Sequence, residues 1–132
     1  AKYFDSEFVI CDKIREKANE VKSVQVIGEV KDKDVIIVDD LIDTGGTIAM
    51  ASNVIMEKGA KSVRAIITHP VLSGNAEENL NNSSLSELVV TDSIPVNVRN
   101  KKIKVLSIAG LFAKAIRKIH ENESTSSLFI NR

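Results

Sequence analysis

The amino-acid sequence predicts an α/β fold with a mostly parallel sheet flanked by helices in a Rossmann-like, three-layer arrangement. Short β-branched runs alternate along the chain with segments of helical spacing, a pattern that favours parallel strands joined by right-handed crossovers. One such run ends abruptly at Asp39 and Asp40 and leads into a glycine-rich turn and a helix. Ligands of open α/β sheets bind at this carboxyl edge of the strands. We therefore expect a ligand site beside the two aspartates.

Length and composition limit the classes of protein to consider. The chain has 132 residues, enough for one domain, and 43% of them are hydrophobic. Eighteen basic and eighteen acidic residues cancel, so no global field favours nucleic acid or anionic lipid. No apolar stretch is long enough to cross a bilayer, and we expect a cytoplasmic protein. The single cysteine, Cys11, lies in an apolar run and is expected to be a small core residue.

The N-terminal half is expected to contain strands and one long helix. A first strand is predicted at residues 8–12. The following segment, 13–25, is charged and has no clean apolar face, so we expect a flexible loop. Further strands are expected at 26–30 and 34–39. A helix is predicted from residue 46 to 58, because Ile48, Ala51 and Ile55 share one face and Gly59 suits its end.

The C-terminal half is expected to continue the alternation. The predicted elements are strands at 63–68, 88–91 and 103–108, a short helix at 75–80 and a final helix at 109–120. His69 and Pro70 should stop the first of these strands, and a histidine at a strand end is more often structural than catalytic. The final helix is amphipathic, because four apolar residues recur at helical spacing and basic residues lie outside them: Phe112, Ala115, Ile116 and Ile119 against Lys114, Arg117 and Lys118.

The glycine-rich turn has the composition of an anion-binding loop. Gly45 and Gly46 allow backbone angles closed to other residues and a close approach by a ligand. Thr44 and Thr47 add hydroxyl donors, and Thr44 is a candidate helix cap. The first backbone N–H groups of the following helix suit a phosphate. The loop lacks the lysine of a Walker A motif, so cradling of a nucleoside triphosphate in that manner is not expected.

The two aspartates are expected to bind a different part of the same ligand from the part bound by the glycine-rich turn. Asp39 and Asp40 would repel a phosphate, since like charges about 4 Å apart cost about 1 to 4 kcal/mol. They suit vicinal hydroxyls, or Mg²⁺ held through water. A sugar phosphate meets both demands. The alternative is a glycine-rich helix cap beside two solvated strand-end residues.

This segment resembles a known motif. Residues 38–47 are similar to the phosphoribosyl-pyrophosphate motif of the type I phosphoribosyltransferase fold, in the version found in the ribose-phosphate pyrophosphokinase family. Residues 68–74, 86–95 and 119–129 also resemble that family. The resemblance covers nearly the whole chain but only the C-terminal part of the family's protein.

The resemblance implies an activity and roles for individual residues. The family transfers the diphosphoryl group of ATP to the anomeric hydroxyl of ribose 5-phosphate with Mg²⁺, giving phosphoribosyl pyrophosphate and AMP. By analogy, Asp39 and Asp40 would bind ribose hydroxyls. The 5-phosphate would be held by five consecutive residues, Asp43, Thr44, Gly45, Gly46 and Thr47. Lys13 and Arg15 match the two cationic positions of the family's flexible catalytic loop, and the resemblance favours a catalytic role for them, whereas their charge alone would favour a solvated loop.

The resemblance also has consequences for assembly and regulation. The tail residues Ser124, Thr125, Ser126 and Phe129 resemble a segment that forms an allosteric site for phosphate or ADP, with a frayed terminus as the alternative. The family's ATP-binding and metal-ligating residues belong to an N-terminal half that this sequence lacks. We therefore expect residues 1–132 to be one domain of a longer two-domain protein, inactive alone and part of a homo-oligomer, with no direct metal ligand.

Two other functions stay open at this stage. A phosphoribosyltransferase would join a base to phosphoribosyl pyrophosphate, but no segment resembles a base-recognising hood. A non-catalytic regulatory subunit of the synthetase would be expected to have lost the loop cations or the aspartates, and the sequence has both.

Overall fold

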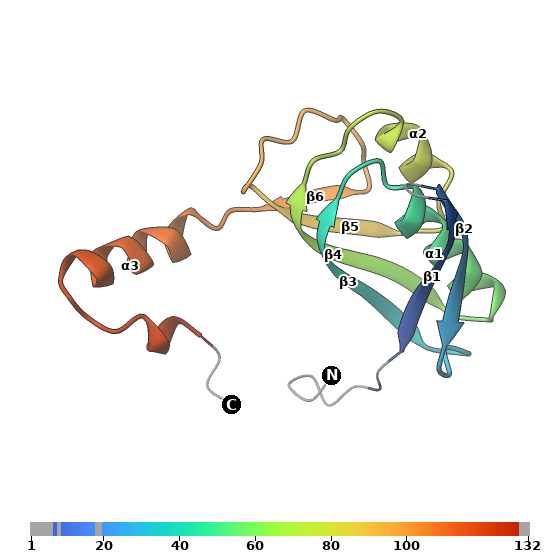
Figure 1. Cartoon of the computed structure of the whole chain (residues 1–132), viewed down its shortest axis with the longest axis horizontal. Coiled ribbons are helices and arrows are strands. Elements are labelled where there is room, and N and C mark those ends of the chain that lie inside the picture. Colours follow the sequence, from blue (N-terminus) through green and yellow to red (C-terminus); the bar gives the residue numbers. More distant parts are fainter. Residues whose placement is uncertain (1–6, 8, 18–19, 130–132) are drawn as a thin grey trace.

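The computed structural model describes residues 7, 9–17 and 20–129 and has a four-stranded sheet at its centre (Figure 1). All neighbouring strands are parallel, and their spatial order follows the chain: β3 (Asp34–Ile42), β4 (Ser62–Pro70), β5 (Glu87–Thr91) and β6 (Ile103–Leu106). Two helices serve as crossovers, α1 (Gly46–Glu57) between β3 and β4 and α2 (Ala76–Asn81) between β4 and β5. The predicted α/β class with a parallel sheet flanked by helices is confirmed.

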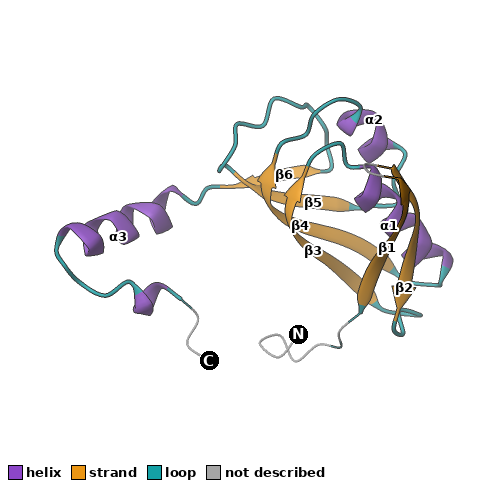
Figure 2. Ribbon diagram, in the orientation of Figure 1, coloured by secondary structure: helices purple, strands orange, loops and turns teal. Residues whose placement is uncertain are grey.

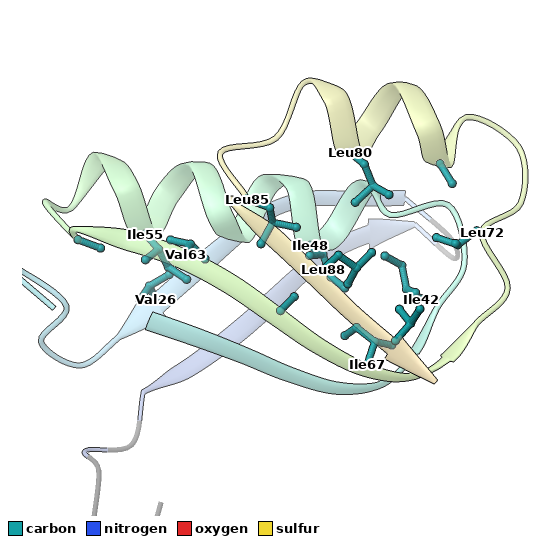
Figure 3. Packing of buried hydrophobic residues seen from close by; sticks show 14 of the residues in the cluster. Val26, Ile42, Ile48, Ile55, Val63, Ile67, Leu72, Leu80, Leu85 and Leu88 are labelled. Atoms are coloured by element: carbon teal, nitrogen blue, oxygen red, sulfur yellow. The ribbon is translucent and has the colours of Figure 1, made fainter. Parts of the chain in front are cut away.

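The hydrophobic core lies between one face of the sheet and helices α1 and α2 (Figure 3). Alternate residues of the central strands point into it, as the two-residue period of a strand requires. Ile55 of α1, Leu80 of α2 and Val63 of β4 are all fully buried. Ile48 and Ala51 are also buried, which confirms the predicted inner face of α1. Gly59 follows that helix at φ +89°, as a C-terminal glycine should.

The segment 13–25 is expected to form a flexible loop, but its described residues, 13–17 and 20–25, lie in a separate antiparallel hairpin of β1 (Ile10–Lys17) and β2 (Glu20–Ile27). Two strands satisfy each other's backbone groups, so a charged segment without an apolar helical face can still be regular. Val24 and Val26 alternate along β2 and are buried, and the Lys58 Nζ after α1 donates to the Val26 carbonyl over 2.8 Å. The hairpin is thereby attached beside α1. Its flexibility stays a prediction.

The last helix, α3 (Ala109–His120), projects away from the sheet and is followed by a short 3₁₀ turn, η2 (Ser126–Leu128), as Figure 2 shows. The bounds of α3 agree with the prediction, but none of its twelve residues, all of them described, is buried. Its apolar face therefore lies in solvent within a single chain. None of the described helices has the length and apolar character needed to cross a membrane.

Candidate functional site

The glycine-rich turn between β3 and α1 forms a pocket at the carboxyl edge of the sheet. Its volume is ≈ 240 Å³, and its lining includes six predicted site residues: Asp39, Asp43, Thr44, Gly45, Gly46 and Thr47. A larger hollow of ≈ 490 Å³ lies beside α2, but Glu77 and Glu78 line it, and their charges disfavour an anion. The pocket at the glycine-rich turn is therefore the one lined by most of the predicted site residues.

The backbone of the turn depends on Gly45. This residue has φ 74°, in the left-handed region, and it is the N-cap of α1. Thr44 was expected to cap the helix, and that expectation is wrong, because Gly45 occupies the cap position and no side chain makes a cap hydrogen bond. The first N–H groups of α1, beginning at Gly46 and Thr47, have no acceptor within the helix. They are available to an anion at the positive end of the helix dipole.

Side chains of α2 and of the connection between β4 and α2 make hydrogen bonds that hold the turn in place. The Asn79 amide donates to the Thr44 carbonyl over 2.7 Å. The Ser73 hydroxyl donates to an Asp43 carboxylate oxygen, and the Ser73 N–H donates to the Asp43 carbonyl over 3.2 Å. Sequence reasoning did not identify Ser73 and Asn79, because they lie 30 and 35 residues from their partners. No local pattern signals a contact at that separation.

The two aspartates lie where β3 approaches the turn. The Asp40 N–H donates to Asp39 Oδ1 over 3.0 Å, and Asp40 is exposed while Asp39 is half-buried. Asp39 lines the pocket, whereas Asp40 does not. In the described part of the chain, no group of three or more histidine, cysteine or acidic residues is placed to hold a metal. The carboxylates of Asp39 and Asp40 suit a diol, or a Mg²⁺ ion that they contact through its bound water. They do not suit a metal that is bound mainly by protein ligands.

The remaining candidates lie in other elements than the glycine-rich turn. Lys13 and Arg15 lie in β1, where the backbone alone is described. The tail forms an ordered turn, in which the Ser124 hydroxyl donates to Ser126 Oγ over 2.8 Å and the Leu128 N–H donates to the Thr125 carbonyl over 2.9 Å. Phe129 is 72% exposed. Figure 1 shows this turn beyond α3, on the far side of the sheet from α1.

His69 makes a contact consistent with a structural role. Its Nδ1 lies 2.9 Å from Ser93 Oγ. The Ser93 hydroxyl donates to the Thr68 carbonyl over 3.0 Å, so its hydrogen is committed and the histidine nitrogen is the donor. This pair joins the ends of β4 and β5 and does not activate the serine.

The parallel sheet, the glycine turn on the first crossover and the strand-end acids together define an α/β domain of the phosphoribosyltransferase-like class. Comparisons with known proteins narrow this class. The phosphoribosyl synthetase-associated domain family matches residues 6–130. A ribose-phosphate pyrophosphokinase of Campylobacter jejuni is 55% identical over 98% of this chain and 42% of the relative. One of Porphyromonas gingivalis is 46% identical over 98% of this chain and 41% of the relative.

A solved structure is similar to the same family of proteins. The phosphoribosylpyrophosphate synthetase from Mycobacterium smegmatis superposes with a TM-score of 0.73 and 45% sequence identity, over 78% of this chain and 35% of that chain. This chain belongs to the phosphoribosyl synthetase-associated domain family, and its relatives are enzymes named ribose-phosphate pyrophosphokinase. The family expected from residues 38–47 is therefore confirmed. The chain spans about two fifths of the length of the curated relatives that it matches.

Proposed function

We propose that this chain is the C-terminal, ribose 5-phosphate-binding part of a ribose-phosphate diphosphokinase. The carrying observation is the single pocket that unites the left-handed glycine turn, the helix N-terminus and a strand-end carboxylate. A phosphate and a diol need opposite kinds of partner, and this pocket offers donors on one side and an acceptor on the other. The kinase name of the relatives favours this substrate over other sugar phosphates.

In this proposal the substrate lies with its two ends on different elements. The 5-phosphate is held by residues 43–47, through backbone N–H groups at the start of α1 and the hydroxyls of Thr44 and Thr47. Asp43 contributes its backbone to this turn, whereas its carboxylate accepts from the Ser73 hydroxyl and does not contact the phosphate, because the two negative charges repel each other. Asp39 and Asp40 accept hydrogen bonds from the ribose hydroxyls. The anomeric hydroxyl is thereby fixed in orientation, which reduces the entropic part of the barrier.

The reaction is a diphosphoryl transfer. The anomeric oxygen attacks the β-phosphorus of ATP, the new O–P bond forms, and the bond from that phosphorus to the bridging α,β-oxygen breaks and releases AMP. The hydroxyl proton is lost to solvent or to a base on the enzyme. Negative charge spreads over the phosphoryl oxygens, and the cations Lys13 and Arg15 would stabilise it. Mg²⁺, when bound, would neutralise the diphosphate of ATP. Asp39 and Asp40 would hold it only through water.

The complete enzyme needs residues beyond the pocket at the glycine-rich turn. Residues that bind adenine and the metal are supplied by a further part of the protein, so the chain alone does not form phosphoribosyl pyrophosphate. The tail residues Ser124, Thr125, Ser126 and Phe129 are proposed to help bind phosphate or ADP as effectors in a cytoplasmic homo-oligomer. Their hydroxyls and an exposed aromatic ring suit a phosphate and a base.

Calorimetry with the 132-residue chain tests the binding step. Ribose 5-phosphate should bind, whereas ribose without the phosphate should not. Thr47→Val should weaken binding of the phosphate ester by about 1 to 3 kcal/mol, the contribution of one charge-assisted hydrogen bond. Thr91→Val is the matched control, since the Thr91 hydroxyl donates to Thr68 on another strand. Unchanged affinity in Thr47→Val, or AMP release by the chain alone, would contradict the proposal.

A further inference from the structure

The Thr44 carbonyl in the glycine-rich turn is bound by a side chain of α2. The Asn79 amide donates to it over 2.7 Å. A carbonyl oxygen only accepts hydrogen bonds, so the part of the Asn79 side chain that faces it is the NH₂ group. Thr44 and Gly45 line the pocket at the turn, whereas Asn79 does not. The hydrogen bond therefore lies outside the space that the pocket offers to a ligand.

The direction of this carbonyl sets the direction of the next N–H group. Thr44 and Gly45 share one planar trans peptide, in which the C=O and the N–H point in opposite directions. With the oxygen held toward Asn79, the Gly45 N–H is directed away from α2. Gly45 is the N-cap of α1, so its N–H has no acceptor within the helix. None of the described residues accepts a hydrogen bond from it, and it is therefore available to a ligand.

Gly45 by itself does not select this orientation of the peptide. Rotating the Thr44–Gly45 peptide by half a turn changes mainly the ψ of Thr44 and the φ of Gly45. Glycine adopts positive and negative φ about equally readily, so the observed φ of 74° needs a further cause. Asn79 supplies one, because the flipped peptide would turn its N–H toward the Asn79 NH₂ group and lose the hydrogen bond.

The packing of α2 fixes the position from which Asn79 donates. Ala76 and Leu80 of this helix are fully buried, and Figure 3 shows Leu80 among the core residues. Lys102 Nζ donates to the Leu80 carbonyl over 2.7 Å and so holds the C-terminal end of the helix. A Cβ added to Gly45 would lie 3.9 Å from Asn79 Cβ, so the helix is in direct contact with the turn. Asn79 thus donates from an element that is anchored in the core.

From these observations we infer that Asn79 is a positioning residue for binding of the sugar phosphate. Its bond to the Thr44 carbonyl keeps the Gly45 N–H directed into the pocket, where a phosphate oxygen accepts it. This inference rests on the proposed function, because that function assigns the phosphate end of the ligand to the turn. Asn79 does not touch the ligand. It raises the fraction of molecules whose turn is ready to bind, and the apparent affinity falls in proportion when that fraction falls.

Calorimetry of the 132-residue chain with ribose 5-phosphate tests this role. Asn79→Ala should raise the dissociation constant by about 3- to 10-fold, the factor that corresponds to one neutral hydrogen bond. Asn79→Leu, which keeps a branched side chain but has no donor, should also weaken binding. Asn81→Ala is the matched control. It removes an asparagine of the same helix whose side chain accepts from Asn100 over 2.9 Å, and it should leave the dissociation constant unchanged.

Inorganic phosphate, measured by its competition with ribose 5-phosphate, shows which end of the ligand is affected. Its affinity should fall by about the same factor in Asn79→Ala, because the altered group meets the phosphate. Circular dichroism checks that each variant is folded, since a purely structural role would lower stability and leave the dissociation constant of the folded protein unchanged.

The outcomes separate this inference from the function on which it rests. Wild-type affinity for either ligand in Asn79→Ala, wild-type affinity for ribose 5-phosphate in Asn79→Leu, or an equal loss of affinity in Asn81→Ala, would overturn the role of Asn79 and leave the proposed function standing. A wild-type chain that does not bind ribose 5-phosphate would contradict the proposed function, and the role of Asn79 with it.

Discussion

Replacing Gly45 by alanine measures how far the glycine-rich turn depends on a residue with a positive φ. Gly45 has φ 74°, where an L-residue with a β-carbon costs about 1 to 2 kcal/mol. An added Cβ would lie 3.7 Å from Ile42 Cδ1 and 3.8 Å from the Ala76 carbonyl, which are ordinary contacts. Since no clash adds to the backbone term, Gly45→Ala should lower the free energy of unfolding by about 1 to 2 kcal/mol.

The neighbouring glycine provides a control of opposite sign. Gly46 is the first residue of α1, and an added Cβ there would lie 3.8 Å from Asn79 Nδ2 and from Thr44 Oγ1. Alanine fits both the space and the helical backbone, and it reduces the freedom of the unfolded chain. Gly46→Ala should therefore stabilise the fold by up to about 1 kcal/mol. Gly45→Asn should fall between Gly45→Ala and the wild type, because asparagine tolerates the left-handed region.

Urea unfolding followed by far-ultraviolet circular dichroism measures these differences at one fixed protein concentration. With a urea dependence of about 1 to 3 kcal/mol per M, the midpoint of Gly45→Ala should fall by about 0.3 to 2 M at an unchanged slope. The midpoint of Gly46→Ala should be unchanged or higher. Wild-type stability in Gly45→Ala, or a greater loss in Gly46→Ala, would show that the turn does not need a left-handed residue at position 45.

Three further predictions concern Asn79 of α2, Asp92 after β5, and Lys13 of β1. Asn79→Ala removes the 2.7 Å bond to the Thr44 carbonyl and should lower the free energy of unfolding by about 0.5 to 1.5 kcal/mol, while Glu78→Ala on the same helix should have little effect in the same urea titration. Hydrogen bonds from the Ser107 side chain and the Ile108 N–H lower the pKa of Asp92 in the folded protein below its ordinary value of 3.8. The stabilisation that the charged Asp92 gives is therefore present above pH 3.8 and is lost as the pH falls through the lowered pKa. Asp92→Asn should therefore flatten the acid side of the stability–pH profile; a profile of unchanged steepness would contradict this. In a complete enzyme, Lys13→Ala should lower kcat more than it raises KM, because its contact forms mainly in the transition state, and steady-state kinetics showing a pure KM effect would argue against that role.

The local parts of the site were predictable because short-range patterns specify them. The β-branched run before Asp39 predicted a strand, which the structure has as β3, although Ile36 and Val38 on its second face are exposed rather than buried. The two glycines after Thr44 predicted a turn, and Gly45 has a positive φ there. The bounds of α3 were also predicted correctly, since its apolar period is sustained over three turns. Each of these inferences uses residues fewer than about five positions apart.

The hairpin of β1 and β2 shows where such patterns fail. Its charged sequence carries no helical period, and its strands are stabilised by pairing with each other and by Val24 and Val26 against α1. Strand pairing is set by partners distant in the chain, so intrinsic preference predicts it poorly. Residues 13–17 and 20–25 therefore lie in strands where the local pattern predicted a loop.

The sequence by itself determined the strand, the turn and the helix start that form the pocket, because backbone angles and hydrophobic period are properties of neighbouring residues. Only the tertiary structure decided that Ser73 and Asn79 hold that turn, and that the apolar side of α3 faces solvent. Contacts between residues 30 or more positions apart depend on how the chain closes on itself. No local preference encodes that closure.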